Sequence, residues 1–407
     1  MTSKLLLVGL LFAFVFGCDK DDIDQEMVNV AIPKTISYSE LRTSVEVESP
    51  KSIVEAGKIY AFTDYIFVND YAEGVHILDN SDPTAPVAHS YLKIPGNYDI
   101  SIKDYYLYAD SAVDLLVFDI SNIDNIRLVE RLENVFPNYD FQIPVEAEFT
   151  DFSTFDYQSD IIIGWDIEQR PKKDYEFPTN EFDVASLSNK SPVGQGGSLA
   201  RFQIVSNYLY TVGTSMLNVF DISNLSSPNR VNELYSGFRI ETMFYADKHL
   251  YLGADNGMYI YDIIDPATPT YVSEFVHWEG CDPVVVDGDY AYLTLRGGNS
   301  CGQLDSVLEV IDISNKYNPT LVSRYFLDNP YGLGFKGNEL FVCDGTSGLK
   351  VYDKTNPSDL RFKYQFQDVF AKDVIPLGDK LLMIGDNILY QYAYDGETLT
   401  LLSTLSL

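Results

Sequence analysis

The sequence has few residues of the kinds that usually mark a catalytic or metal centre. Its 407 residues include four histidines, four cysteines and two tryptophans. The histidines, at positions 76, 89, 249 and 277, are scattered and lack the spacing of metal ligands. The sequence also has no glycine-rich phosphate loop and no Gly-x-Ser-x-Gly nucleophile motif. It therefore predicts a protein that is not an enzyme and that uses no metal and no cofactor.

Basic residues are scarce as well. The chain has 28 Lys and Arg against 60 Asp and Glu, which gives a formal net charge of −32 at pH 7. Such a surface repels phosphate backbones, and this argues against nucleic acid as a partner. The charge promotes solubility, and it also favours basic partners and divalent cations.

Long hydrophobic runs are absent except for one, Leu5–Phe16, which follows Lys4. The run is too short to span a bilayer comfortably, and Gly17 and Cys18 come directly after it. This start resembles a bacterial lipoprotein signal with a Val15-Phe16-Gly17-Cys18 lipobox. The resemblance implies a signal peptide at residues 1–17, cleavage before Cys18, and a lipid on the sulfur of that cysteine.

Lys20, Asp21 and Asp22 follow the predicted lipidation site. A lysine with acidic residues at this place resembles the export signal of surface lipoproteins of Bacteroidetes. The resemblance implies a lipid anchor in the outer membrane, with the protein facing the cell exterior. We expect residues 18–40 to form an acidic flexible tether.

A short pattern that ends in Asp recurs along the rest of the chain, and its best-preserved copies are the two VFDISN segments. Its period is about 40 residues, and one interval is longer by roughly 60 residues. A seventh copy has Ala393 in place of the acidic residue. The six aligned acidic residues are Asp79, Asp119, Asp221, Asp262, Asp312 and Asp353.

Each repeat predicts four short antiparallel strands, because alternating apolar residues are separated by tight polar turns. Four-stranded units with this period are typical of propeller blades. The predicted fold is all-β, a seven-bladed β-propeller over residues 41–407 with an insertion at 139–198 between blades 2 and 3. Residues 41–50 resemble an outermost strand that either joins the last blade or stands as an extra edge strand. The blades are expected to start near residues 58, 97, 199, 239, 282, 331 and 372.

The repeat resembles the LVIVD-repeat propellers of exported bacterial proteins, and the resemblance covers residues 58–407. The whole arrangement, with its signal and insertion, resembles LVIVD-repeat lipoproteins of Bacteroidetes. The resemblance implies a fold and an export route, but it implies no activity.

The repeated acidic residue ends the third strand of each unit. A carboxylate there can accept backbone N–H groups of the following turn, so we interpret the six residues as structural turn caps. A metal-binding ring is disfavoured because the symmetry would spread the carboxylates around the outer part of the disc. The turns of this face are short and uniform.

The opposite face carries the variable loops, and binding sites favour such loops on a rigid scaffold. The insertion is either a closing flap or a recognition surface built on aromatic side chains. The candidate binding residues of this face are Phe152, Phe155, Trp165, His277, Trp278, Glu279, Asp282, Arg296 and Tyr331.

Three cysteines follow Cys18. Cys281 begins one blade and Cys301 lies in a long loop of the same blade, at the same predicted edge. A disulfide between them would pin that loop, and the alternative is two free thiols. Cys343 lies in an apolar strand and is expected to be a buried free thiol.

These features favour a surface-anchored, non-catalytic interaction scaffold. The expected partner is an outer-membrane barrel protein or an assembly, transport or secretion complex. Capture of a glycan or peptide at the same face is the alternative, and a hydrolase or lyase that uses carboxylates is a third interpretation.

Overall fold

The computed structural model describes residues 27–137, 144, 147–172, 201–237, 239–254, 256–276, 283–297, 305–396 and 398–407. Nearly all regular structure in these ranges is β-strand. The described part of the chain contains one α-helix, α1 (Tyr38–Thr43), and one 3-10 helix, η1 (Ile123–Asn125). No helix among the described residues is long and apolar enough to cross a membrane.

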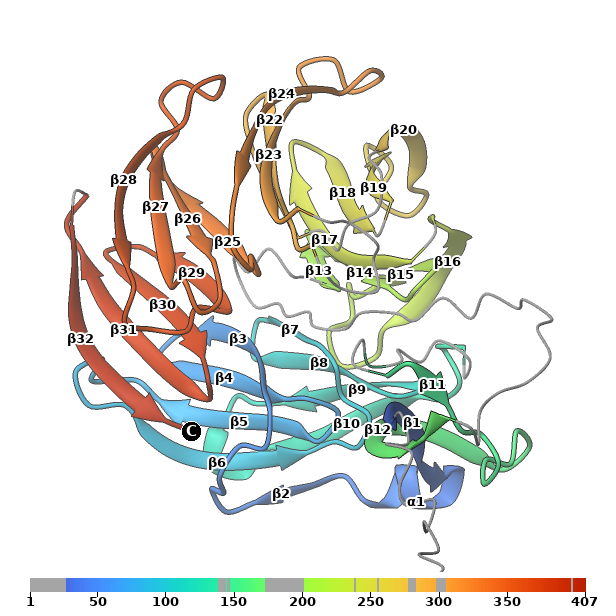
Figure 1. Cartoon of the computed structure of the whole chain (residues 1–407). Helices are drawn as coiled ribbons and strands as arrows, with labels where there is room; N and C mark the ends of the chain where they lie inside the picture. Colours follow the sequence, from blue (N-terminus) through green and yellow to red (C-terminus); the bar gives the residue numbers. More distant parts are fainter. Residues whose placement is uncertain are drawn as a thin grey trace, which may run out of the picture.

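Seven antiparallel sheets stand around a common centre, which confirms the predicted seven-bladed β-propeller (Figure 1). Within a blade, four strands follow one another in the chain and pair with their sequence neighbours. The first strand is innermost and the fourth is outermost. An eighth, three-stranded sheet stands outside the ring of blades.

Blades 1 and 2 precede the insertion, and blades 3 and 4 follow it. Their strands are, for blade 1, β3 (Ala56–Phe62), β4 (Tyr65–Asp70), β5 (Gly74–Asp79) and β6 (Val87–Lys93); for blade 2, β7 (Ile100–Lys103), β8 (Tyr106–Ser111), β9 (Asp114–Asp119) and β10 (Arg127–Leu132); for blade 3, β13 (Phe202–Val205), β14 (Tyr208–Val212), β15 (Met216–Asp221) and β16 (Asn229–Tyr235); and for blade 4, β17 (Ile240–Ala246), β18 (His249–Ala254), β19 (Gly257–Asp262) and β20 (Thr270–Val276).

The last three blades complete the ring. Their strands are, for blade 5, β21 (Val284–Asp287), β22 (Tyr290–Leu295), β23 (Val307–Asp312) and β24 (Thr320–Phe326); for blade 6, β25 (Leu333–Lys336), β26 (Glu339–Cys343), β27 (Leu349–Asp353) and β28 (Arg361–Phe366); and for blade 7, β29 (Asp373–Leu377), β30 (Lys380–Gly385), β31 (Ile388–Tyr394) and β32 (Leu399–Ser406).

Burial along a blade follows from its position between two neighbours. The second strands are buried on both faces, as Leu209 and Tyr210 of β14 illustrate, because adjacent blades cover both sides of the sheet. The outermost strands alternate, with exposed residues such as Val231 of β16. Continuous apolar runs are typical of strands that are covered on both faces.

In three blades a glycine lies at the start of the third strand or directly before it, because a side chain there would clash with the backbone of the fourth strand. Gly257 has φ of 140°, and a Cβ atom at this position would lie 1.9 Å from the carbonyl oxygen of Phe275. Gly348 has φ of 80°, and its Cβ would lie 1.7 Å from the carbonyl oxygen of Phe366. The glycine therefore allows the third and fourth strands to approach closely.

We predict that Gly257→Ala lowers the free energy of unfolding by roughly 2–3 kcal/mol, because strained positive φ and a backbone clash act together. Gly288→Ala is the matched control. Its φ is also positive, at 59°, but no atom lies within 4 Å of the added Cβ. The control should lose only about 1 kcal/mol. Urea denaturation of both variants measures the difference, and equal losses would contradict the packing argument.

The ring closes without exchange of strands between its ends. Blade 7 packs directly on blade 1 through an apolar cluster that includes Ile59, Ile66, Ile375 and Leu382. The short strand β2 (Glu46–Glu48) pairs antiparallel with β6 as a fifth, outermost strand of blade 1. The segment around residues 41–50 thus supplies an extra edge strand, and it does not join the last blade.

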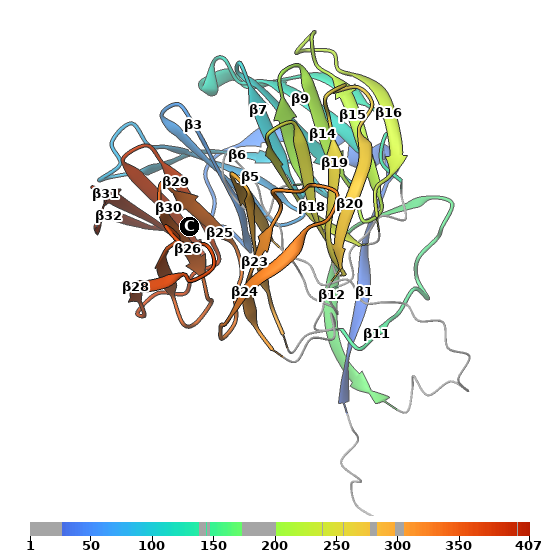
Figure 2. The same cartoon turned by 90° about the horizontal axis from the view of Figure 1, so that it is seen from above.

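The eighth sheet, which we call the flap sheet, consists of β11 (Phe149–Thr150), β1 (Met27–Ser37) and β12 (Asp160–Pro171). Its central strand β1 comes from the N-terminal segment, and the other two come from the insertion. The flap sheet projects to one side of the disc (Figure 2).

The prediction of a flexible tether over residues 18–40 is wrong for residues 27–40. Residues 27–37 form β1, which pairs with β12 along its whole length, and residues 38–40 begin α1. Val28, Val30 and Ala31 are buried in this sheet. The β-branched residues Val28, Val30 and Ile32 are a strand signal that the acidic residues before them obscured.

Candidate functional site

The six repeated acidic residues lie on one face of the disc, where the turns are uniform. Each carboxylate accepts the backbone N–H of the residue two positions ahead, at 2.6–3.0 Å. Hydrogen bonds from the side chain of that residue, together with these backbone bonds, lower the pKa of five of the six carboxyl groups, and that of Asp353 falls to about 2. In blade 7, where Ala393 takes the position, Asp395 accepts the N–H of Thr398 at 2.8 Å.

The other face carries the flap sheet, which is fixed to blade 2. Arg42 of α1 contacts the buried carboxylate of Asp114 through Nε at 3.1 Å, and Arg131 contacts the same group at 2.9 Å. Leu41 and Ile161 pack against Val113, which lies in the loop between β8 and β9. Ionic and apolar contacts thus hold the base of the flap sheet at a defined position.

Aromatic side chains gather on the flap sheet, and two of the three predicted ones are accessible. Phe152 packs against Trp165 with ring centroids 5.7 Å apart and against Phe155 at 6.0 Å. Phe155 is only 8% exposed, so its assignment to a contact surface is wrong; it supports the cluster from within. Tyr157 packs on Phe155 at 4.6 Å and is 69% exposed, an accessible aromatic residue that the sequence analysis missed.

A cavity of about 290 Å³ lies between the flap sheet and blade 1. Tyr71 and Glu73, from the loop between β4 and β5, form one wall. The opposite wall consists of strand residues of the flap sheet, including Trp165. Because neither segment encloses this space alone, the cavity depends on the pairing of β1 with the insertion. Its lining residues are Lys34, Val54, Glu55, Tyr71, Ala72, Glu73, Pro144, Ile163, Gly164, Trp165 and Ile167.

Two further predicted binding residues meet on the same face between blades 5 and 6. The guanidinium of Arg296 lies over the ring of Tyr331, 4.4 Å from its centroid. The hydroxyl of Thr294 donates to the carbonyl oxygen of Tyr331 at 2.6 Å. This pair is stacked and fixed in place. The remaining predicted residues of this face lie outside the described residues: His277, Trp278, Glu279 and Asp282.

The proposed disulfide pair, Cys281 and Cys301, also lies outside the described residues, as do Cys18, Lys20, Asp21 and Asp22. Cys343 is a buried free thiol in β26. Burial raises the pKa of this thiol, and the nearby carboxylates of Asp373 and Asp344 raise it further. A thiol of this kind is unreactive at neutral pH.

Four buried charges, which we call the axial charge belt, lie at one repeat position in consecutive blades. The position is four residues before the end of the innermost strand. It is occupied by Asp373 in blade 7, Lys58 in blade 1, Asp99 in blade 2 and Arg201 in blade 3. The equivalent residues in blades 4–6 are uncharged: Thr242, Pro283 and Gly332. The charge is therefore confined to one half of the ring.

Lys58 and Asp99 form an ion pair at 2.6 Å with both side chains fully buried. Asp99 also accepts the backbone N–H groups of Arg201 at 2.9 Å and Phe202 at 2.7 Å. Burial lowers the pKa of Lys58 to about 8, although the charge of Asp99 opposes this shift. Lys58 remains protonated at neutral pH, so the pair joins blades 1, 2 and 3 near the axis.

Asp373 is the least satisfied member of the axial charge belt. Neither of its buried carboxylate oxygens has a hydrogen-bond partner of normal geometry among the described residues. Burial raises its pKa to about 7, and the backbone N–H of Val374 and the positive charges of Lys58 and Lys372 only partly oppose this effect. Asp373 therefore titrates close to neutral pH.

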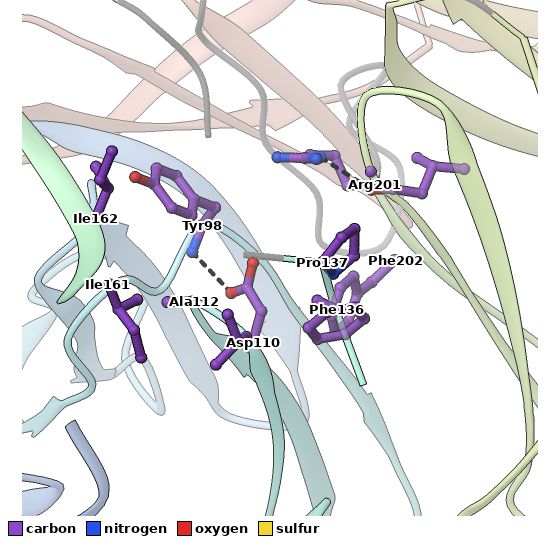
Figure 3. A pocket seen from close by; sticks show the side chains of 12 residues that line it. Tyr98, Asp110, Ala112, Phe136, Pro137, Ile161, Ile162, Arg201 and Phe202 are labelled. Carbon is purple, nitrogen blue, oxygen red and sulfur yellow. Dashed lines mark hydrogen bonds between the residues drawn. The ribbon is translucent and has the colours of Figure 1, made fainter. Parts of the chain in front are cut away.

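A second, much smaller cavity of about 50 Å³ lies beside the belt, between blades 2 and 3 and the base of β12. Figure 3 shows Arg201 on one wall, with Tyr98 and Asp110 on the other. Asp110 accepts the N–H groups of Tyr98 and Asp99 and an amide proton of Asn97, at 2.7–2.9 Å. Burial raises its pKa to about 6. These bonds indicate that Asp110 has a structural role. The cavity is large enough for a few water molecules.

Sequence reasoning missed the axial charge belt, although a signal was present. Alignment on the innermost hairpin turns places Lys58, Asp99, Arg201 and Asp373 in one column. No group of three or more His, Cys, Asp or Glu side chains in the described part of the chain is placed to hold a metal ion.

Comparison with known proteins agrees with this architecture. Four segments match the model of the LVIVD repeat, at residues 55–92, 96–133, 196–234 and 281–326. They correspond to blades 1, 2, 3 and 5. The search of curated proteins finds no match.

Several solved structures share the fold. BamB from Moraxella catarrhalis has a TM-score of 0.50 and 7% identity, over 90% of this chain and 99% of that one. The periplasmic gluconolactonase PpgL of Pseudomonas aeruginosa has a TM-score of 0.51 and 11% identity, over 89% and 96%. Sqt1 of Saccharomyces cerevisiae has a TM-score of 0.51 and 10% identity, over 88% and 86%. At such identities the likeness shows the fold alone: the chain is a β-propeller that contains LVIVD repeats.

Proposed function

We propose that the protein is a surface lipoprotein, anchored in the outer membrane through Cys18, that acts as a non-catalytic interaction scaffold. Its partner is an outer-membrane barrel protein or an assembly, transport or secretion complex. The flap sheet and the loops around it form the contact face. The observation that carries the proposal is the position of β1, the first described strand after the proposed anchor.

The position of β1 orients the disc relative to the membrane. Cys18 precedes Met27 by nine residues, and nine residues span at most about 30 Å when fully extended. Strand β1 begins at the end of the flap sheet that points away from the blades (Figure 2). A lipid on Cys18 therefore keeps the flap sheet nearer to the membrane than the opposite face. Membrane proteins are the partners that this face meets first.

The arrangement of the carboxylates favours a scaffold over a hydrolase or lyase. Asp110 and Asp373 have raised pKa values, as catalytic acids often do. However, Asp110 is occupied by backbone and amide donors, and its cavity of about 50 Å³ is too small for a substrate. The aromatic rings of the flap sheet meet edge to face, at 81° for Phe152 and Trp165, and do not form a flat platform for sugars.

Purification from native membranes in mild detergent tests the proposal. We expect wild-type protein to co-purify stoichiometrically with an outer-membrane protein, identified by mass spectrometry. Cys18→Ser should leave the membrane fraction and lose the partner. Recovery of the wild-type protein alone would contradict the scaffold role, and membrane retention of the Cys18→Ser variant would contradict the anchor.

A further inference from the structure

We infer that the cavity between the flap sheet and blade 1 is a receptor for a lysine or arginine side chain of the protein partner. The inference rests on the proposed function and specifies the chemistry by which the contact face recognises its partner. It is carried by the volume of the cavity, by the charge of its walls and by its aromatic lining.

The size of the cavity suits a long side chain. Its volume of about 290 Å³ exceeds that of an amino-acid side chain but falls at the lower limit of sites for drug-sized ligands. The lining combines polar groups with apolar surface from Ile163, Ile167 and Trp165. Lys and Arg combine an apolar stem with a charged end, and a cavity lined in this way accommodates both parts.

The wall on the blade 1 side is negatively charged and rigid. Glu55 and Glu73 both line the cavity. The buried carboxylate of Asp70 accepts the backbone N–H of Glu55 at 2.8 Å and that of Val54 at 3.1 Å, which fixes this segment. The N–H of Tyr71 donates to the carbonyl oxygen of Glu55 at 2.9 Å. A fixed wall with two carboxylates attracts a cation with little loss of conformational entropy.

The single basic residue of the lining does not cancel this charge. Lys34 forms an ion pair with Asp166 at 3.1 Å, and both side chains are largely exposed. Together with Glu55 and Glu73, the group carries a formal net charge of about −2. The whole chain carries −32, so the surrounding field also favours a cation. Phosphate and carboxylate ligands are disfavoured by the same field.

Aromatic rings supply the remaining contacts. Tyr71 and Trp165 lie on opposite walls of the cavity. Tyr71 is braced by Tyr98, with ring centroids 5.0 Å apart, and Trp165 is braced by Phe152. A cation near the face of Trp or Tyr gains on the order of 0.5–2 kcal/mol, and arginine is the commonest partner in such pairs. Carboxylates and aromatic rings therefore act on the same charged group.

Gly164 makes the cavity accessible to a structural test. Its Cβ, if present, would lie 3.6 Å from Cδ of Lys34 and 3.7 Å from Cβ of Ala72, both ordinary contact distances. Gly164→Val should therefore fit the backbone and keep β12 paired with β1. The added methyl groups would occupy the space between the two walls. This variant obstructs the cavity without changing any charge.

The binding test uses the fluorescence of Trp165 in the full-length protein. The chain has only two tryptophans, so a Trp278→Phe background makes Trp165 the sole reporter. At about 0.15 M salt, where long-range attraction is screened, N-acetyl-arginine amide should change the emission saturably. N-acetyl-citrulline amide, which has nearly the same shape without the charge, should bind at least tenfold more weakly. Equal binding of both probes, or no saturable change with either, would overturn the inference.

Variants then assign the binding to this cavity. The Glu55→Gln/Glu73→Gln double variant and Gly164→Val should each weaken the arginine probe by tenfold or more. Asp124→Asn is the matched control, because Asp124 lines a cavity of about 240 Å³ with aromatic walls on the opposite face. It should leave the affinity unchanged. An affinity that falls equally in Asp124→Asn would show general electrostatic attraction and overturn the assignment.

The membrane pull-down separates this inference from the proposed function. If wild-type protein retains a partner and Glu55→Gln/Glu73→Gln retains it equally, the scaffold role stands and the cavity is not the receptor. If neither retains a partner while the arginine probe still binds, the scaffold role fails and the cation site stands. Loss of the partner in the double variant and in Gly164→Val, but not in Asp124→Asn, supports both.

Discussion

Replacement of Lys58 by methionine should lower the free energy of unfolding by roughly 3–5 kcal/mol, one of the largest losses for any single substitution in this chain. Methionine fills a similar volume but leaves the buried carboxylate of Asp99 without its cation. The two groups are 2.6 Å apart and both are fully buried, so water cannot replace the lost charge. The substitution also removes a positive charge that acts on Asp373. Urea denaturation at pH 7 measures the change.

Two further variants test whether the lost stability comes from the unpaired buried charge. Arg127→Met removes the cation of an exposed pair with Asp119, in which Arg127 is 63% exposed, and should cost less than about 1 kcal/mol. In Lys58→Met/Asp99→Asn the buried charge is gone, and the Asn oxygen can still accept the N–H groups of Arg201 and Phe202. The double variant should regain part of the lost stability, because the asparagine NH2 group takes the place of the oxygen that accepts the N–H of Ile100. If it is no more stable than Lys58→Met, the loss comes from packing and not from the unpaired charge.

Replacement of Asp373 by asparagine should stabilise the protein more at pH 8 than at pH 5. The folded pKa of Asp373 is about 7, whereas the unfolded value is near 3.8. Between these values the folded state holds a proton that the unfolded state has lost, so stability falls as the pH rises towards 7. A shift of about three units corresponds to a penalty of up to about 4 kcal/mol above pH 7. The asparagine side chain is neutral throughout and avoids this penalty.

Urea denaturation of wild type and Asp373→Asn at pH 5 and pH 8 measures the effect. Asp110, whose pKa is also raised, is present in both proteins, and its contribution cancels in the comparison. Asp79→Asn is the control. The pKa of Asp79 is lowered, so the contribution of its carboxylate to stability changes only below about pH 4 and is the same at pH 5 and pH 8. A difference between wild type and Asp373→Asn that is the same at pH 5 and pH 8 would show that Asp373 does not titrate in this range.

The repeat made the fold predictable from the sequence. Asp221 and its five equivalents mark the end of the third strand, and the innermost hairpins are closed by two-residue turns with strong sequence signals. Both signals are local, so they do not depend on which blades become neighbours. The edge strand at Glu46–Glu48 was recognised as a strand, but its partner in blade 1 could not be identified, because pairing of β2 with β6 is a non-local choice.

The candidate site was harder to predict for the same reason. Val30 pairs with Glu168 and Phe149, more than 100 residues away in the sequence, and no local pattern specifies this pairing. Trp165 and Phe152 were identified from their residue types, whereas Glu55 and Glu73 were not, because acidic residues are common throughout this chain. Their significance appears only when the flap sheet covers the loop that carries them.

The closure of the ring within blade 7 has a mechanical consequence. A protein anchored through its N-terminus would receive tension along β1, which pairs with β12 over eleven positions. Load along two antiparallel strands is shared among all their hydrogen bonds, and α1 and β2 lie next in line. Since no N-terminal strand belongs to blade 7, this force does not act directly on the seam between the last and first blades. Tension on the anchor would therefore separate β1 from β12, and so disrupt the contact face, before it separated blade 7 from blade 1.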